Sequence, residues 1–379
     1  MARRVVLHVG LMKSGTTFLQ GLLFANQQRL AEQGVLVPGE EWGAQVRGIR
    51  DLLVKPGADP GPQPAWRALV EEIDRWDGTA VISMEFMGAF RESQAAAAVA
   101  SFPPGTVDVV LTVRDLNRSL ASMWQETVQN GRGWSWPDYL EGAKRARPRP
   151  RLDPARRTEA GRTFWRQQDL ARVVGRWGAV AGIDHVTVVT VPPPGAPAAE
   201  LTERFARVVG FDPAGLAAGG SGSSGNASVG AASAELLQRV NASLAAAGIA
   251  AGTGKPLRKE LLAKQVLGPR AKSEQRIGLP VERWVRRYAA GMVEAVRASG
   301  CRLEGAWTDL TPVDVSGVDP SRVASADLVS AGHDGFVGLR ELLAEHGVTD
   351  LPDWPGATTP ENAVAALADL VRRGLAARI

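Results

Sequence analysis

Short apolar runs alternate with helix-patterned segments along the first 210 residues of this chain. The apolar runs are rich in β-branched residues and lack a helical repeat, and they cover residues 5–9, 79–84, 107–113 and 185–191. Segments with helical spacing cover residues 16–33, 91–100, 117–128 and 163–180. A repeated strand-then-helix order is typical of a parallel sheet covered by helices. The sequence therefore predicts an α/β fold, a three-layer and mainly parallel sheet with helical additions toward the C-terminus.

The composition is that of a globular protein without a disulfide framework. Hydrophobic residues make up 45% of the 379 residues and charged residues 22%, which is far from the composition of disordered chains. Cys301 is the one cysteine, which excludes intrachain disulfides and multi-cysteine zinc sites. The first apolar run is far shorter than the roughly 20 residues of a membrane span. We therefore expect a cytoplasmic protein with no membrane anchor.

The charge balance gives little support to a nucleic-acid partner. Lysine and arginine number 44 against 40 acidic residues, and the resulting net charge of +4 is too mild to indicate one. Basic residues concentrate between positions 144 and 157, where seven stand against the single acid Asp153. We interpret this stretch as a solvated loop, and the alternative is a lip that attracts anions.

The later part of the chain is organised around a segment rich in glycine and serine. Residues 219–230 contain almost nothing that packs, so they are either a mobile insertion loop or a domain linker, and we favour the loop. Helical spacing resumes at residues 235–247, 257–266 and 281–298. We expect one α/β domain over residues 1–310, with the loop inside it. Residues 311–379 then form a small helical appendage, which ends in a helix near 361–378.

The connection between the first strand and the first helix carries the most specific motif. Residues 10–17 read Gly-Leu-Met-Lys-Ser-Gly-Thr-Thr. Small residues let backbone N–H groups converge there, and the following helix adds the positive end of its dipole. The alternative is an ordinary glycine turn, but a lysine, hydroxyl groups and two glycines coincide directly after a strand. The motif therefore predicts a phosphate or sulfate site.

The same motif departs from the loop of the nucleoside triphosphatases. That loop requires a lysine directly after its second glycine, where this chain has Thr16, and the lysine stands instead at Lys13. A magnesium-nucleotide site also uses an aspartate at the end of a second strand, whereas Arg114 comes first after residues 107–113. A cation stands where the metal-binding anion is needed, so we expect no metal here.

Together these residues resemble the sulfotransferases that use 3′-phosphoadenosine-5′-phosphosulfate (PAPS) and release adenosine 3′,5′-bisphosphate (PAP). The 5′-phosphosulfate loop of that family reads Lys-Ser/Thr-Gly-Thr-Thr, and residues 13–17 match it. The family also places an arginine at the end of a second strand and a serine eight residues later, to hold the 3′-phosphate. Arg114 and Ser122 have this spacing. The resemblance covers about the first 210 residues and implies a P-loop-like sulfotransferase core.

The spacing of the arginine and the serine agrees with this implication. Eight residues place Ser122 on the first turns of the helix after Arg114, where a guanidinium and a hydroxyl converge on one phosphate. Two alternatives stay open. Arg114 is a structural ion-pair partner in the first, and Ser119 takes the place of Ser122 in the second.

Two further nucleotide contacts follow from the resemblance. Aryl-type members carry an aromatic residue after the double threonine that stacks on adenine, and Phe18 occupies this position. Since Phe18 also starts the apolar face of its helix, the alternative is a core phenylalanine. The aryl-type members have an Arg-Lys-Gly element late in the chain, which is absent here. Arg270, Lys272 and Arg276 are possible substitutes.

Sulfuryl transfer needs positioning and neutralisation of charge on the leaving oxygen. Lys13 suits this role, because it can reach the oxygen that bridges sulfur and the 5′-phosphate. Ser14, Gly15, Thr16 and Thr17 would supply N–H and hydroxyl donors to the phosphate. The alternative is that Lys13 only binds.

A base must also take the proton of the acceptor. Glu85 is the first ionisable residue after residues 79–84, which places it at the carboxyl edge of the sheet where such folds build their sites. In the resembled family, glycan-type members use glutamate as the base and aryl-type members histidine. Glu85 could instead pair with Lys13 or an arginine. His8 is the second candidate, although a lone histidine on a buried strand is more often a core residue.

Residues of the following helix complete the set of candidates. Glu126 lies four residues beyond Ser122 and therefore on the same helical face, but an exposed carboxylate is the commoner outcome. Trp124, Trp134 and Trp136 either wall an acceptor pocket or pack a loop, and we assign them no catalytic role.

The sequence thus predicts a PAPS-dependent sulfotransferase whose acceptor is a hydroxyl group of a small molecule or a glycan, without nucleic-acid partner. The oligomeric state is left open. The alternatives are a phosphotransferase that uses ATP and Mg²⁺, and a nucleotide-binding protein without catalysis.

Overall fold

A single parallel sheet organises the first part of the molecule. The computed structural model describes residues 2–53, 59, 61–148, 158–217 and 228–379. Six strands pair in the order β2-β3-β1-β4-β5-β6, and every pairing is parallel. The strands are β1 (Arg4–His8), β2 (Val35–Leu36), β3 (Thr79–Ser83), β4 (Val107–Val113), β5 (Val186–Thr190) and β6 (Arg302–Glu304). The predicted parallel sheet is confirmed.

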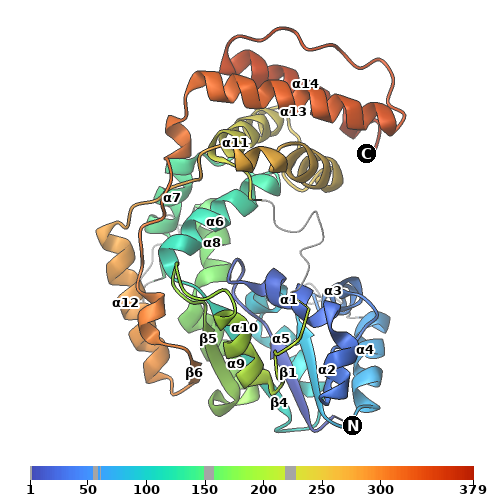
Figure 1. Ribbon diagram of the computed structural model, residues 1–379, viewed down its shortest axis with the longest axis vertical. Coiled ribbons are helices and arrows are strands. Elements are labelled where there is room, and N and C mark those ends of the chain that lie inside the picture. Colours follow the sequence, from blue (N-terminus) through green and yellow to red (C-terminus); the bar gives the residue numbers. More distant parts are fainter. Residues whose placement is uncertain (1, 54–58, 60, 149–157, 218–227) are drawn as a thin grey trace. The chain divides into compact units, whose positions relative to one another are not determined.

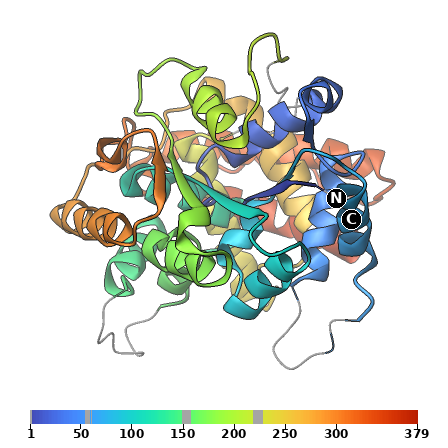
Figure 2. The ribbon, with the colours of Figure 1, turned by 90° about the horizontal axis from the view of Figure 1, so that it is seen from below.

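Helices lie on both faces of the sheet (Figure 2). Alternating side chains of the strands pack against these helices. Leu7 and Val9 face one cluster and Val6 the other, and all three are fully buried. One face is covered by α3 (Trp42–Asp51), α4 (Pro64–Asp74), α5 (Glu92–Ala100), α9 (Leu170–Ala181) and α12 (Arg283–Ala298). The other face is covered by α1 (Thr16–Ala25), α2 (Gln27–Glu32) and α10 (Glu200–Val209). The sheet is thus the middle one of three layers.

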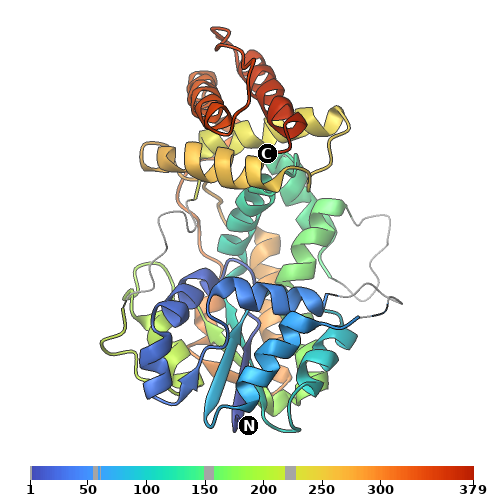
Figure 3. The same cartoon turned by 90° about the vertical axis from the view of Figure 1, so that its right-hand side faces the viewer.

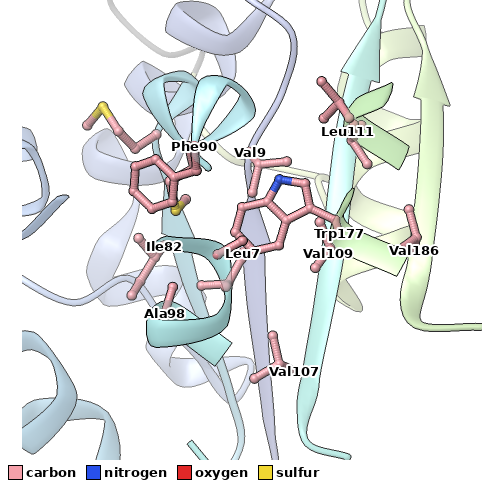
Figure 4. Packing of buried hydrophobic residues seen from close by; sticks show 14 of the residues in the cluster. Leu7, Val9, Ile82, Phe90, Ala98, Val107, Val109, Leu111, Trp177 and Val186 are labelled. Atoms are coloured by element: carbon pink, nitrogen blue, oxygen red, sulfur yellow. The ribbon is translucent and has the colours of Figure 1, made fainter. Parts of the chain in front are cut away.

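Large aromatic side chains close the core on the first face (Figure 4). The ring of Trp177 on α9 stacks on that of Phe90, with 6.3 Å between the ring centroids. Both belong to the core cluster that includes the strand residues Leu7 and Val109. Burial of such rings contributes most of the apolar area that holds a helix to a sheet.

The predicted helix over residues 16–33 is wrong as a single element. It is interrupted at Asn26, between α1 and α2. The side-chain amide of Asn26 donates to the carbonyls of Leu22 and Ala217. This local bonding competes with the helical ladder, which explains why the helix ends there. Gly34, which follows α2, has a φ of +81° and ends the segment as predicted.

The predicted helix over residues 163–180 is also two helices, α8 (Glu159–Gln168) and α9. The carboxylate of Asp169 accepts a hydrogen bond from the backbone N–H of Arg172, 3.3 Å away, and so caps α9. Aspartate is among the strongest residues at this position, so a new helix begins rather than the old one continuing.

The chain divides into two compact units. The first consists of residues 1–119, 166–223 and 282–312, and it holds the sheet. The second consists of residues 120–165, 224–281 and 313–379 and is helical. Its helices are most of α6 (Leu116–Gln129) and of α8, with α7 (Trp136–Arg145), α11 (Ala231–Ala246), a π-helix (Pro256–Val266), α13 (Ser325–Glu345) and α14 (Pro360–Ala376).

These units differ from the expected division at residue 310. The difference arises because α13 and α14 pack on α11 and the π-helix, as Figure 3 shows in red against yellow and gold. Gly335 of α13 lies close to both α14 and α11. A Cβ at this glycine would be 3.2 Å from Leu367 of α14 and 3.7 Å from Leu236 of α11. The C-terminal helices therefore complete a core rather than append to one.

Several expectations fall on other parts of the chain. Most of the Gly/Ser segment, residues 219–227, lies outside the described residues, as do residues 149–157 of the basic stretch. Lys144 and Arg145 of that stretch belong to the last turn of α7. In the part of the chain that the structure describes, no helix combines the length and apolar character that crossing a membrane requires.

Candidate functional site

The predicted phosphate loop and Arg114 lie at the same edge of the sheet. The chain leaves β1 toward β2 on one side of the sheet and leaves β4 toward β5 on the other. β1 and β4 are themselves paired, with His8 opposite Val110 (Figure 1). Open parallel sheets bind ligands beyond the carboxyl ends of two such strands, where the strand order reverses. Residues 10–15 follow β1 there, and Arg114 directly follows β4.

The loop after β1 has an unusual backbone. Gly10, Lys13 and Gly15 have φ angles of +31°, +64° and +83°. A Cβ at Gly10 would lie 2.4 Å from Thr16 Cγ2, and one at Gly15 would lie 2.6 Å from Leu201 Cδ2, so both positions require glycine. For Lys13 the left-handed region costs on the order of 1 kcal/mol, and such residues cluster at functional sites.

Helix α1 begins directly after this loop with Gly15 as its N-cap. Among the described residues, no side chain caps this end, and its first turn contains no acidic residue. The backbone N–H groups of the first turn and the positive end of the helix dipole therefore face the loop, and no acidic residue of that turn neutralises them. This is a suitable environment for an anion.

The hydroxyl of Ser14 is directed into the sheet. It donates to the carbonyl of Thr112, 2.7 Å away, and lies 3.1 Å from the hydroxyl of the same residue. Its side chain is buried. The expectation that the Ser14 hydroxyl serves the phosphate is therefore not supported, and its donor toward an anion is the main-chain N–H.

His8 continues this hydrogen-bonded chain across three strands. Its Nε2 lies 3.0 Å from the Thr112 hydroxyl and its Nδ1 lies 2.7 Å from the Ser83 hydroxyl. The imidazole is fully buried, and this burial lowers the pKa of His8 to about 3. With both nitrogens bonded inside the sheet, His8 is a neutral core residue and does not reach an acceptor as a base.

Glu85 follows β3 at the carboxyl edge of the sheet, as predicted. It begins the short 3₁₀ helix Glu85–Ala89 after β3. Gly88 of this helix packs on the loop, where a Cβ would be 2.7 Å from the carbonyl oxygen of Gly10. The Glu85 carboxylate accepts a hydrogen bond of 2.8 Å from the amide of Gln20 on α1. Its side-chain partner is thus an amide, rather than the lysine or arginine of the alternative interpretation.

Arg114 is bonded to the start of the next helix. One terminal nitrogen donates to the carbonyl of Arg118, 2.9 Å away. Burial, together with the nearby charge of Arg118, lowers the pKa of Arg114 to about 10. The guanidinium therefore stays protonated at neutral pH.

The carboxylate of Asp115 bonds to Arg118 in the first turn of the helix that follows it. It is buried, accepts a hydrogen bond of 3.0 Å from the backbone N–H of Arg118, and forms an ion pair with the guanidinium of that residue. The nearest carboxylate after β4 is thus a helix cap. It is not arranged to hold a metal ion.

The two candidate serines on α6 belong to different units. Ser119 is buried in the first unit, and Ser122 is half-buried in the second. The convergence of Arg114 and Ser122 on one phosphate stays a prediction.

Phe18 and the two threonines show how the start of α1 is presented. Phe18 is 41% exposed, so the interpretation as a core phenylalanine is wrong and its ring is available for stacking. Thr16 is buried and Thr17 is exposed.

Glu126 lies in the second unit, in a half-buried ion pair rather than in solvent. Its carboxylate lies 2.6 Å from the ammonium of Lys259 and accepts from the amide of Asn130. The expectation of an exposed carboxylate is wrong because the side chains of Lys259 and Asn130 bond to it.

The tryptophans nearby pack the second unit. Trp124 and Trp136 are buried and stack edge to face, and Trp124 donates to the carbonyl of Trp134. These contacts favour the interpretation that the tryptophans pack a loop.

The possible late nucleotide contacts are also in the second unit. Arg270 pairs with Glu274 and Asp334, while Lys272 and Arg276 are exposed. Arg270 therefore already has two acidic partners.

Gln168 and Gln20 are the site neighbours that the motif did not indicate. The amide of Gln168 donates to the carbonyl of Met12 at the tip of the loop, 2.8 Å away. Gln20 lies one helical turn beyond Thr16, which is the signal that places it near the loop. For Gln168 the sequence contains no comparable signal.

A cavity of about 510 Å³ lies elsewhere in the first unit, beside α2 and the end of β2. Glu40 and Glu72 line it, and none of the candidate site residues does. Two carboxylates disfavour a phosphorylated ligand, so this cavity does not suit the anion that the loop motif predicts.

No family model matches this sequence, and neither a curated protein nor a solved structure shows significant similarity to it.

Proposed function

We propose that this chain is a sulfotransferase with a P-loop-like sulfotransferase core, which transfers the sulfuryl group of PAPS to an acceptor hydroxyl. One observation carries the proposal: the parallel pairing of β1 and β4, which brings the Lys13 loop and Arg114 to one edge of the sheet. Two cationic side chains at neighbouring strand ends suit a nucleotide with phosphates at both its 3′ and 5′ positions.

The loop fits a 5′-phosphosulfate. Its two glycines leave no room for a Cβ, and the backbone of Lys13 lies in the left-handed region. Helix α1 begins without an acidic residue in its first turn. Lys13, Gly15, Thr16, Thr17 and the main chain of Ser14 would hold this group. Arg114 would hold the 3′-phosphate, and Phe18 would stack on adenine.

The chemistry of transfer divides between two side chains. PAPS supplies the activated sulfuryl group when bound. Lys13 neutralises the charge on the leaving phosphate oxygen as the bond from that oxygen to sulfur breaks. Glu85 takes the proton of the acceptor hydroxyl as the oxygen–sulfur bond forms. Gln20 holds the Glu85 carboxylate by the 2.8 Å hydrogen bond from its amide.

The proposed acceptor is a hydroxyl group of a small molecule or a sugar, and the proposed location is the cytoplasm. His8 is fully buried, so the candidate base is the carboxylate of Glu85. In the resembled family a glutamate base belongs to the glycan-type members, and this supports an alkyl hydroxyl as the acceptor. The sequence contains no nucleic-acid-binding motif, so we do not propose a nucleic acid as a partner.

A kinase-like use of ATP and Mg²⁺ is the first alternative. The position after Gly15 lacks the required lysine, and Asp115 is committed to its helix cap and to Arg118. A nucleotide-binding protein without catalysis is the second alternative, and PAP binding without consumption of PAPS would distinguish it.

The test is a calorimetric titration with PAP and, separately, with ATP and Mg²⁺, together with an assay of PAPS consumption. We expect PAP to bind more tightly than ATP and Mg²⁺, and PAPS to be hydrolysed slowly even without an acceptor. We expect Lys13→Ala to lower turnover further than it weakens nucleotide binding. Equal or tighter binding of ATP would contradict the proposal.

A further inference from the structure

The interruption between α8 and α9 brings a side chain to the phosphate loop. Asp169 starts the new helix, so Gln168 is the last residue of α8. Its side chain is buried, and its amide donates to the carbonyl of Met12, 2.8 Å away. In a continuous helix over residues 163–180, the side chain of Gln168 would lie on a helix face and not at the end of a helix beside the loop.

Lys13 is therefore fixed on both sides. On one side, the amide of Gln168 holds the carbonyl of Met12. On the other, the hydroxyl of Ser14 bonds the backbone of Thr112 in β4. Between these two bonds, Lys13 has its φ of +64°. A lysine keeps a left-handed backbone conformation only when the surrounding structure holds that conformation. The direction of the side chain depends in turn on the backbone conformation.

We propose that Gln168 is a positioning residue for Lys13: it holds the Met12 carbonyl and thereby keeps the lysine in the conformation that presents its ammonium to the bound anion. The inference rests on the proposed function for the identity of that anion. Gln168 touches no reacting atom, and it acts through the loop backbone.

The test measures PAP affinity by calorimetry in the 379-residue protein and four variants. Gln168→Met keeps the length of the side chain and removes its donor, and we expect it to weaken PAP binding by about tenfold. In a Lys13→Ala background we expect the same change to weaken binding less than twofold, because the ammonium it positions is gone. The dependence on Lys13 is the readout that a merely structural role would not produce.

Gln27→Met is the matched control. Gln27 also donates its amide to turn carbonyls, those of Val37 and Gly39 at 2.9 and 2.7 Å, but away from the loop. It should leave PAP affinity unchanged. An equal loss from Gln168→Met in both backgrounds, or no loss in either, would overturn the proposal.

Hydrogen exchange separates this inference from the proposed function. If the wild-type protein binds no PAP, the proposed function fails, and the amides of residues 11–17 then decide the role of Gln168. Exchange there that is about tenfold faster in Gln168→Met, and unchanged in Gln27→Met, supports the positioning role. Unchanged exchange in both variants overturns it.

Discussion

At the residue scale, His8 makes the stability of the first unit dependent on pH. Burial lowers the pKa of His8 from 6.5 to about 3, so between these values the unfolded chain binds a proton that the folded chain does not. The stability associated with neutral His8 is therefore fully present above pH 6.5. It is lost as the pH falls, at up to about 1.4 kcal/mol per pH unit.

Urea unfolding at several pH values between 7.5 and 5 measures this effect. The wild-type protein should lose stability faster than His8→Gln below pH 6.5, since the variant has no group to titrate at this position. The variant is expected to be less stable overall at pH 7.5, because its amide cannot reproduce both hydrogen bonds. Parallel pH dependence in the two proteins would contradict the neutral, buried state of His8.

The residues of the phosphate loop show what can be predicted at this scale. Lys13, Gly15 and Arg114 are expected from motif and spacing alone, because strand ends and the turns that follow them are local features. The direction of the Ser14 hydroxyl cannot be predicted in this way, because its partner Thr112 lies 98 residues away in the sequence. The contact of Gln168 with Met12 spans 156 residues and is equally beyond any local pattern.

At the scale of elements, two helix glycines test the packing of the helices. A Cβ at Gly332 of α13 would lie 2.7 Å from the Cβ of Ala363 on α14, whereas at Gly291 of α12 nothing lies within 4 Å. Gly332→Ala should therefore destabilise the protein by about 1–3 kcal/mol through overpacking. Gly291→Ala should stabilise it by about 0.5–1 kcal/mol, because alanine favours the helix.

Thermal unfolding of the two variants checks this contrast directly. Gly332→Ala is expected to lower the transition temperature of the second unit and Gly291→Ala to raise that of the first. A rise in both would mean that α13 and α14 do not pack as closely as the structure places them.

The elements themselves were predictable to different degrees. β4 has the predicted bounds, and β1, β3 and β5 differ from theirs by one residue at one or both ends. Continuous β-branched runs buried on both faces give a clear signal. The interruptions at Asn26 and Asp169 were missed. Asn26 bonds Ala217, 191 residues away, and helical periodicity continues through both positions.

At the scale of the whole molecule, the chain passes repeatedly between the two units, so a boundary near residue 310 does not separate them. A chain that ends at Pro312 would lose α13 and α14 and expose the side of α11 on which they pack, including Leu236. We expect this chain to aggregate or to lose its cooperative transition. A chain that lacks only Arg378 and Ile379 is the control, and it should unfold like the 379-residue chain.

Sedimentation and near-ultraviolet circular dichroism distinguish the outcomes for the shortened chain. A monomer that ends at Pro312 and keeps the near-ultraviolet spectrum of the 379-residue chain would mean that the C-terminal helices are an independent appendage after all.

The central claim is that Lys13 and Arg114 recognise opposite ends of one doubly phosphorylated adenosine. Calorimetry with PAP and AMP tests it most directly, because AMP lacks only the 3′-phosphate. We predict that Lys13→Ala weakens both ligands alike, by about tenfold, while Arg114→Ala weakens PAP alone and removes its advantage over AMP. If the wild-type protein does not prefer PAP to AMP, or if Arg114→Ala keeps that preference, the claim is contradicted.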